Sequence, residues 1–150
     1  MRKFVLPSLT IGLAVLTAGC GPSLRPLYYD YEPSRSTAPD SSFAKVEDAL
    51  RETGWQIASA DVPNTVATRE RTLQQWGLYT VDVTLEAMPM SNGRYVRLLI
   101  HPYRDYIIGG ESPIAFLPSG LKSDIIPSLN DAFEKRGIEP LGTPSTRAGD

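Results

Sequence analysis

Residues 79–100 read YTVDVTLEAMPMSNGRYVRLLI, and they carry the clearest structural pattern in the chain. From residue 79 to residue 87, apolar side chains occupy every second position and alternate with polar ones, which is typical of a strand with one buried face. Ser91-Asn92-Gly93 then supplies the residue types that left-handed hairpin turns favour. The alternation resumes after the turn. We therefore expect a β-hairpin in which residues 78–88 pair with residues 94–101.

An amphipathic helix is predicted on each side of this hairpin. The first begins near residue 41 and ends at Gly54, and the second begins near Ser123 and ends at Gly137. Pro127 is compatible with the second helix only within its first turn, so the helix proper is expected to begin just before it. The apolar residues that recur at helical spacing are Phe43, Val46 and Leu50 in the first helix and Ile125, Leu129 and Phe133 in the second.

Residues 55–60 and 65–72 also carry strand signals and are separated by turn residues. The predicted order is therefore helix, three- to four-stranded antiparallel sheet, helix, which is an α+β fold with both helices on one face of the sheet. This single domain is expected to cover residues 41–138, and residues 139–150 are expected to form a disordered tail.

The segment at residues 103–118 is too apolar for an ordinary exposed loop. It is either a short strand with a connection that covers the core, or an exposed apolar patch that binds a partner. In the second case the candidate partner surface consists of Tyr106, Ile107, Ile108, Ile114, Phe116 and Leu117.

The N-terminal residues have the features of a cleaved export signal. Arg2 and Lys3 are followed by an apolar run that is too short to span a bilayer. The run ends in Leu16-Thr17-Ala18-Gly19-Cys20, which resembles the lipobox of bacterial lipoproteins, except that Thr17 stands where Leu is usual. The resemblance covers residues 1–21.

The resemblance implies that the signal, residues 1–19, is cut between Gly19 and Cys20, and that Cys20 carries the lipid that holds the protein to a membrane. Several acyl chains on one residue give stable anchoring. The residue after the cysteine is Gly21 rather than Asp, which resembles the signal for the outer membrane. We therefore expect a lipid anchor in the outer membrane, facing the periplasm, if the organism has two membranes.

Residues 20–40 are rich in proline and serine and are expected to tether the domain to this anchor. Three tyrosines, at positions 28, 29 and 31, are unusual for a solvated linker. They pack either on the membrane interface, where tyrosine is favoured, or as a partly ordered strand on the surface of the domain.

The composition excludes several classes of function. The chain of 150 residues has one Cys and one His, so an intrachain disulfide or a metal site built on several thiolates or histidines is excluded. Its formal charge of -2 falls to -4 when the signal is removed, which argues against nucleic acid as a partner. No cofactor motif is present. His101, with Asp105 as the nearest carboxylate, lacks the sequence context of a serine nucleophile, so we expect no enzyme.

Arginines at positions 94, 97 and 104 form a weak candidate for an anion-binding patch, together with Arg69 and Arg71 if their strands are neighbours. On strand surfaces such arginines usually pair with acids or protect an edge. The functional expectation is a membrane-anchored lipoprotein of the cell envelope whose domain is a non-enzymatic interaction or scaffold module for an envelope protein. The alternative is a carrier of a lipid or another small hydrophobic molecule.

Overall fold

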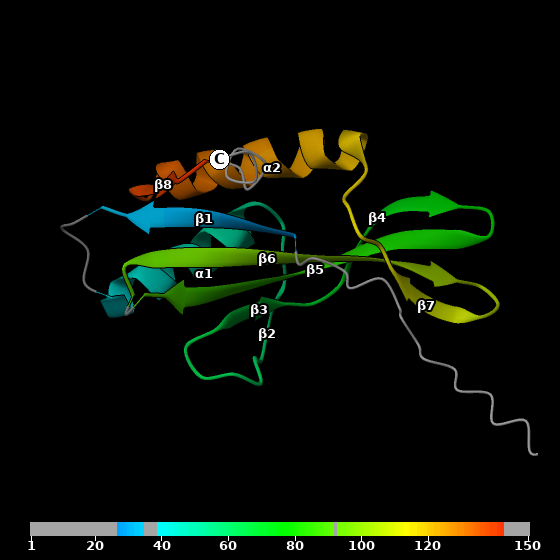
Figure 1. Cartoon of the computed structure of the whole chain (residues 1–150), viewed down its shortest axis with the longest axis horizontal. Helices are drawn as coiled ribbons and strands as arrows, with labels where there is room; N and C mark the ends of the chain where they lie inside the picture. The colour runs from blue at the N-terminus through cyan, green and yellow to red at the C-terminus, as the bar shows by residue number, and fades with distance from the viewer. Residues whose placement is uncertain (1–26, 35–38, 92, 143–150) are drawn as a thin grey trace, which may run out of the picture.

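A computed structural model describes residues 27–34, 39–91 and 93–142 of the chain. Two helices and eight strands are present in these residues (Figure 1). In chain order they are β1 (Leu27–Pro33), α1 (Pro39–Glu52), β2 (Ile57–Ala58), β3 (Val66–Thr68), β4 (Arg71–Trp76), β5 (Tyr79–Met90), β6 (Tyr95–Tyr106), β7 (Gly110–Pro113), α2 (Ser119–Glu134) and β8 (Ile138–Pro140).

The hairpin of β5 and β6 is confirmed and is longer than expected. The two strands pair antiparallel along twelve residues each, from Tyr79 opposite Tyr106 to Met90 opposite Tyr95. On either side of the turn, Ser91 and Gly93 have positive φ angles of 49° and 81°. These are backbone conformations that glycine adopts without cost and that the tight turn requires.

This hairpin forms the spine of one antiparallel sheet. Near the β5–β6 turn, the strand order is β2-β3-β5-β6-β1-β8. Toward the other end of the hairpin, β4 takes the place beside β5 and β7 takes the place beside β6 (Figure 1). Each long strand therefore has different neighbours along its two halves, and the far half projects as a four-stranded ribbon beyond the helices.

The predicted fold of three to four strands flanked by helices was wrong, because the protein is dominated by an eight-stranded sheet. The prediction lacked β1, most of β4, and β8, and it left β7 as one of two possibilities. β7 and β8 have only four and three residues. Such segments cannot show the alternation by which a strand is recognised. They exist because a neighbouring strand offers an edge on which even a short segment completes its backbone hydrogen bonds: β7 pairs with β6, and β8 pairs with β1.

One strand lies in the segment that the sequence assigned to the tether. β1 pairs with β6 on one side and with β8 on the other. Tyr29 and Tyr31 are buried in the core, with 4% and 1% of their surface exposed. The folded domain therefore includes residues on the N-terminal side of residue 41, and the tyrosines are explained by packing within the sheet. β8 likewise extends the fold to Pro140.

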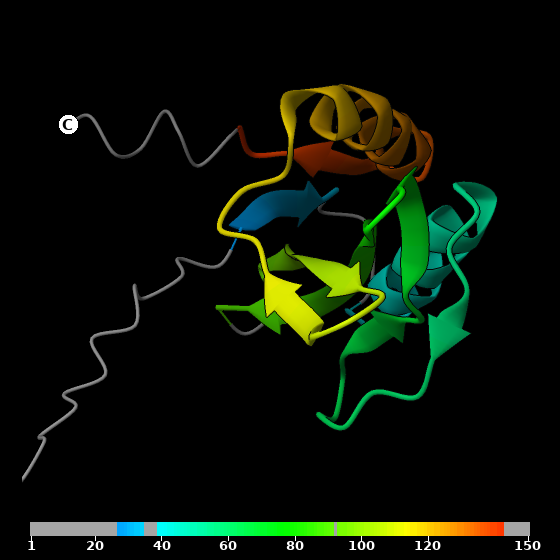
Figure 2. The ribbon, with the colours of Figure 1, turned by 90° about the vertical axis from the view of Figure 1, so that its right-hand side faces the viewer.

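The core lies between the sheet and the two helices. The odd-numbered residues of β5 from Val81 to Ala87 and the even-numbered residues of β6 from Val96 to Ile100 point to this side and are buried. They meet the apolar faces of α1 and α2, which also pack against each other (Figure 2). The Phe133 ring of α2 packs on Tyr31 at 4.5 Å between ring centroids.

The second helix begins earlier than its sequence indicates. α2 starts at Ser119, so Pro127 lies inside the helix rather than in its first turn. The cost of a proline there is offset by burial of Leu121, Ile125 and Ile126 against the core. None of the helices in the described ranges combines the length and the apolar character needed to cross a bilayer.

Candidate interaction surface

Two turns at the far end of the sheet carry an unusual concentration of exposed apolar side chains. Trp76 and Leu78 lie at the turn between β4 and β5, and Ile107 and Ile108 lie at the turn between β6 and β7. Their exposed fractions are 55%, 76%, 76% and 91%, respectively. We call these four residues the apolar tip. They are four of the seven large apolar side chains that are exposed in the described part of the chain.

The two turns are tied together at their ends. The backbone N–H of Ile107 donates a hydrogen bond to the carbonyl oxygen of Leu78 at 3.2 Å. This bond continues the β5–β6 ladder one step beyond Tyr79 and Tyr106, the last paired residues. The apolar tip is therefore one surface, held by the sheet, rather than two independent loops.

A row of aromatic rings supports the tip from behind. The ring of Tyr79 lies 6.5 Å from that of Trp76 and 5.4 Å from that of Tyr106, between centroids. The Arg104 guanidinium lies 5.4 Å from the Tyr79 ring, on the opposite side of the strand pair from Asp105. These contacts hold the large side chains in place at low additional cost in conformational entropy.

The six residues of the partner surface predicted from sequence lie in three different places in the structure. Ile107 and Ile108 belong to the apolar tip, and Tyr106 supports it. Leu117 is buried in the core, and Ile114 packs against it. Phe116 is exposed, but it lies in the connection from β7 to α2, beyond the point where Ile114 bonds Pro102. Both readings of residues 103–118 therefore hold for part of the segment.

Sequence reasoning missed Trp76 and Leu78. Gly77 is a turn residue with a large apolar residue on each side, and this pattern was a signal that could have identified them. Only the β5–β6 pairing brings this turn next to residues 107 and 108, which are about 30 positions further along the chain.

The structure does not bring the three candidate arginines together. Arg97 is engaged by Asp30 through two hydrogen bonds. Arg104 points to the opposite face of β6, because the two positions differ by an odd number of residues. Arg94 lies exposed at the β5–β6 turn, at the other end of the hairpin from the apolar tip.

The outer face of the sheet is polar and internally satisfied. The buried carboxylate of Asp82 accepts hydrogen bonds from the hydroxyl groups of Thr72, at 2.5 Å, and Thr80. Tyr103 donates a hydrogen bond to Glu70 at 2.6 Å. Burial, and then this bond, raises the pKa of Tyr103 above its usual range.

His101 pairs with a carboxylate other than the one its sequence suggested. Its Nε2 lies 3.3 Å from a carboxylate oxygen of Glu86. Asp105 is four residues further along the same strand, about 13 Å away at strand spacing, and is beyond contact. With 44% of its side chain exposed, His101 sits on an open sheet surface rather than in a cleft.

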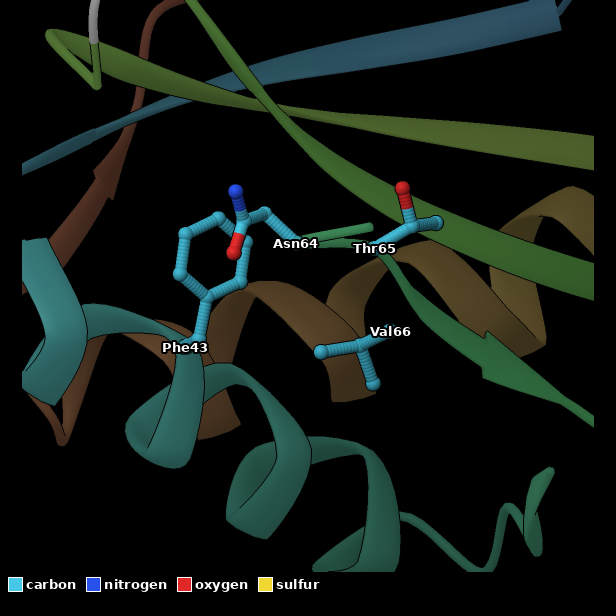
Figure 3. A pocket seen from close by; sticks show the side chains of 4 residues that line it. All are labelled: Phe43, Asn64, Thr65 and Val66. Carbon is cyan, nitrogen blue, oxygen red and sulfur yellow. The ribbon is translucent and has the colours of Figure 1, made fainter. Parts of the chain in front are cut away.

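A hollow of about 230 Å³ lies where α1 approaches the start of β3. It opens to solvent. Its lining consists of Phe43, Asn64, Thr65 and Val66 (Figure 3). The buried hydroxyl of Thr65 has no hydrogen-bond partner among the described residues. The hollow is smaller than the usual pocket for a small molecule.

Gly19 and Cys20, the residues expected at the cleavage and lipidation site, lie outside the described residues. Within the described ranges, no group of three or more His, Cys, Asp or Glu side chains is placed to hold a metal ion. No protein-family profile matches the chain, and no curated protein has a similar sequence.

Proposed function

We propose that this protein is a lipid-anchored lipoprotein of the cell envelope whose sheet-dominated domain is a non-enzymatic interaction module. The N-terminal signal that ends in Gly19-Cys20 supports the anchor. The anchor site would be the outer membrane, facing the periplasm, in an organism with two membranes.

The observation that carries the proposed interaction is the apolar tip. Four large apolar side chains with more than half of their surface exposed lie on two turns that are joined by a backbone hydrogen bond. Monomeric soluble proteins rarely leave such a cluster in contact with water, and exposed apolar patches commonly mark binding sites. Trp is also enriched where binding energy concentrates.

The lipid anchor is tested by metabolic labelling with a fatty-acid analogue in cells. We expect label on the wild-type protein and none on the Cys20→Ser variant. An unlabelled wild-type protein would contradict the anchor.

The interaction surface is tested by placing a photo-crosslinking amino acid at position 78 or 108 in live cells. Position 62 is the matched control, because Val62 is also apolar and 59% exposed but lies in the β2–β3 loop. We expect crosslinks to an envelope component, protein or lipid, from the tip positions and none from position 62. Equal yields from all three positions would contradict the proposal.

A carrier of a lipid or small hydrophobic molecule is the second candidate, and the hollow beside Phe43 is the observation that bears on it. Its volume and its open position argue for a weaker role than the apolar tip. A Phe43→Ala variant that changed the retention of a bound lipid, while a Leu78→Asp variant did not, would favour the carrier.

A further inference from the structure

We propose that the apolar tip inserts into the surface of the lipid bilayer that holds the Cys20 anchor. This inference rests on the proposed function, because it names the partner of the same surface. The domain would then be held against the membrane by its two turns as well as by its lipid, in one defined orientation.

The shape of the apolar tip suits a bilayer better than a protein pocket. Leu78, Ile107 and Ile108 are 76% to 91% exposed and occupy the turns themselves, at the extreme end of the projecting ribbon (Figure 1). A protruding surface of this kind needs a soft partner that closes around it. Hydrocarbon chains do so without a complementary shape.

The order of side chains along the ribbon matches the layers of a bilayer. The aliphatic residues Leu78, Ile107 and Ile108 lie in the turns. The rings of Trp76, Tyr79 and Tyr106 lie at the last paired positions of the strands that lead into those turns, and they contact one another. Trp and Tyr are favoured at the boundary between hydrocarbon and headgroups, because their rings are apolar and carry one polar group. Aliphatic residues are favoured one layer deeper.

Backbone polar groups at the tip are partly satisfied before any insertion. The hydrogen bond from Ile107 to Leu78 occupies one donor and one acceptor that would otherwise need water. An unpaired backbone group moved out of water carries a large penalty, so this bond lowers the cost of shallow insertion.

Charged residues limit how deep the apolar tip can go. Asp105 and Glu111 lie directly opposite each other on β6 and β7, and both are exposed. Asp105 lies one position from Tyr106, and Glu111 lies one position from Gly110; Tyr106 and Gly110 are the last paired residues before the turn. Carboxylates are expelled from hydrocarbon, so the turns can enter the headgroup boundary but the strands behind them cannot. Because carboxylates are not attracted to anionic headgroups, insertion should not require anionic lipid.

The direction of β1 places the anchor on the same side. β1 begins at Leu27 opposite Ile100, and from there β6 runs about 20 Å toward Tyr106 and the apolar tip. Cys20 is seven residues before Leu27, and seven residues span at most about 25 Å. A lipid on Cys20 can thus reach the membrane plane that the tip would touch.

Tryptophan fluorescence tests this contact directly, since the chain has only two tryptophans. Trp55 is buried in the core and 3% exposed, whereas Trp76 is at the tip. The full-length protein, as purified from cells, is reconstituted in phosphatidylcholine vesicles with or without brominated acyl chains. We expect the brominated chains to quench part of the wild-type emission and to leave the emission of a Trp76→Phe variant unchanged.

A second comparison uses charge at matched sites. Leu78→Asp combined with Ile108→Asp should abolish the quenching of Trp76, and Val62→Asp should preserve it. A fully buried Leu or Ile side chain corresponds to an about ten- to hundredfold difference in partitioning, so the double substitution is expected to remove contact almost completely.

Flotation of the same vesicles separates the two proposals. Protein that does not float with the vesicles contradicts the lipid anchor and the proposed function. Protein that floats but shows no quenching of Trp76 contradicts bilayer insertion alone. If crosslinking from positions 78 and 108 in cells then captures one protein, the tip is a protein-binding surface and the present inference is overturned.

Discussion

Arg97 donates two hydrogen bonds to the carboxylate of Asp30 on the neighbouring strand. The Nε atom of Arg97 lies 2.8 Å from one carboxylate oxygen of Asp30, and Nη2 lies 2.9 Å from the other. The residues are directly opposite in the register of β1 and β6. The Arg97 guanidinium also lies 4.0 Å from the centroid of the Tyr28 ring. The hydrogen bond to Asp30 raises the pKa of Arg97 above its usual value.

Removal of Arg97 should destabilise the protein more than a neutral change at Asp30. Only 8% of the Asp30 side chain is exposed. Arg97→Leu therefore leaves the Asp30 carboxylate without its partner and with little access to water. We expect a loss of about 2 kcal/mol, below the range for a fully buried pair because Arg97 is partly exposed. Asp30→Asn keeps one acceptor and should cost less. Urea unfolding measures both.

The control for this pair is Arg94→Leu, in the exposed β5–β6 turn. Its effect should stay within about 0.5 kcal/mol. If Arg94→Leu and Arg97→Leu cost the same, the strand-pairing role of the Arg97–Asp30 pair is wrong.

Tyr31 is expected to stabilise the core through its ring more than through its hydroxyl group. The ring is 1% exposed, and the hydroxyl donates a hydrogen bond to Oδ1 of Asn130 at 2.8 Å. Tyr31→Phe should cost about 1 kcal/mol, from the lost bond, whereas Tyr31→Ala should cost about 3–5 kcal/mol. Thermal unfolding of both variants checks the order, and equal losses would show that the hydroxyl group dominates.

The same residue predicts a loss of stability in alkali. Burial is the largest cause that raises the pKa of Tyr31 well above its usual value of 10. The folded state therefore holds the neutral phenol, while the unfolded state releases its proton above about pH 10. Stability should be complete below that pH and should fall as the pH rises further. Tyr31→Phe should weaken this dependence, and an unchanged profile would count against the assignment.

Glu52 predicts a dependence on pH at the acidic end. It accepts hydrogen bonds from Arg136, at 2.6 Å, and from Lys135, at 3.2 Å, which join the end of α1 to the end of α2. The bond from Arg136, and then that from Lys135, lowers the pKa of Glu52 below its usual 4.5. The stabilisation should be present above about pH 4.5 and should disappear as the pH falls through the lowered pKa.

The check is a comparison of Glu52→Gln with the wild type by thermal unfolding between pH 3 and pH 7. The two melting temperatures should differ slightly near neutrality and converge in acid. Because the Glu52 side chain is exposed to solvent, added salt should reduce the difference at neutral pH. A difference that grew in acid would contradict this account.

Charge at the apolar tip should leave the fold intact. Leu78 and Ile108 are 76% and 91% exposed, so Leu78→Asp and Ile108→Asp should each change the free energy of unfolding by less than about 0.5 kcal/mol. Leu85→Ala, at a fully buried position of β5, should cost about 2–5 kcal/mol. Comparable losses at Leu78 and Leu85 would mean that the turn is part of the core.

The central hairpin and both helices could be predicted from sequence because each carries its own periodic signal. Alternation over residues 79–87 identifies the buried face of β5, and Gly54, with a φ of 84°, ends the first helix as expected. Strands without such a signal, β1, β7 and β8, could not be counted in this way. β7 contains Gly and Pro and has no buried side chain, so its strand character comes from pairing with β6 alone.

The candidate site was predicted in part for the same reason. Ile107 and Ile108 stood out as apolar residues in a loop-like context. Ile114 and Leu117 are apolar residues of the same segment, yet they pack on the core. They lie just before α2, which begins at Ser119 and packs on the sheet. Apolar composition is common to both pairs. Burial depends on which neighbours the fold supplies.

The hairpin, the two amphipathic helices and the expectation of a lipid on Cys20 follow from residues that are close together in the chain. The number of strands, the place of β1 inside the sheet and the apolar tip depend on contacts between distant segments. Strand pairing joins Leu78 to Ile107 across nearly 30 residues. Periodicity describes one segment at a time, and such a long-range contact arises only when two segments share a ladder of backbone hydrogen bonds.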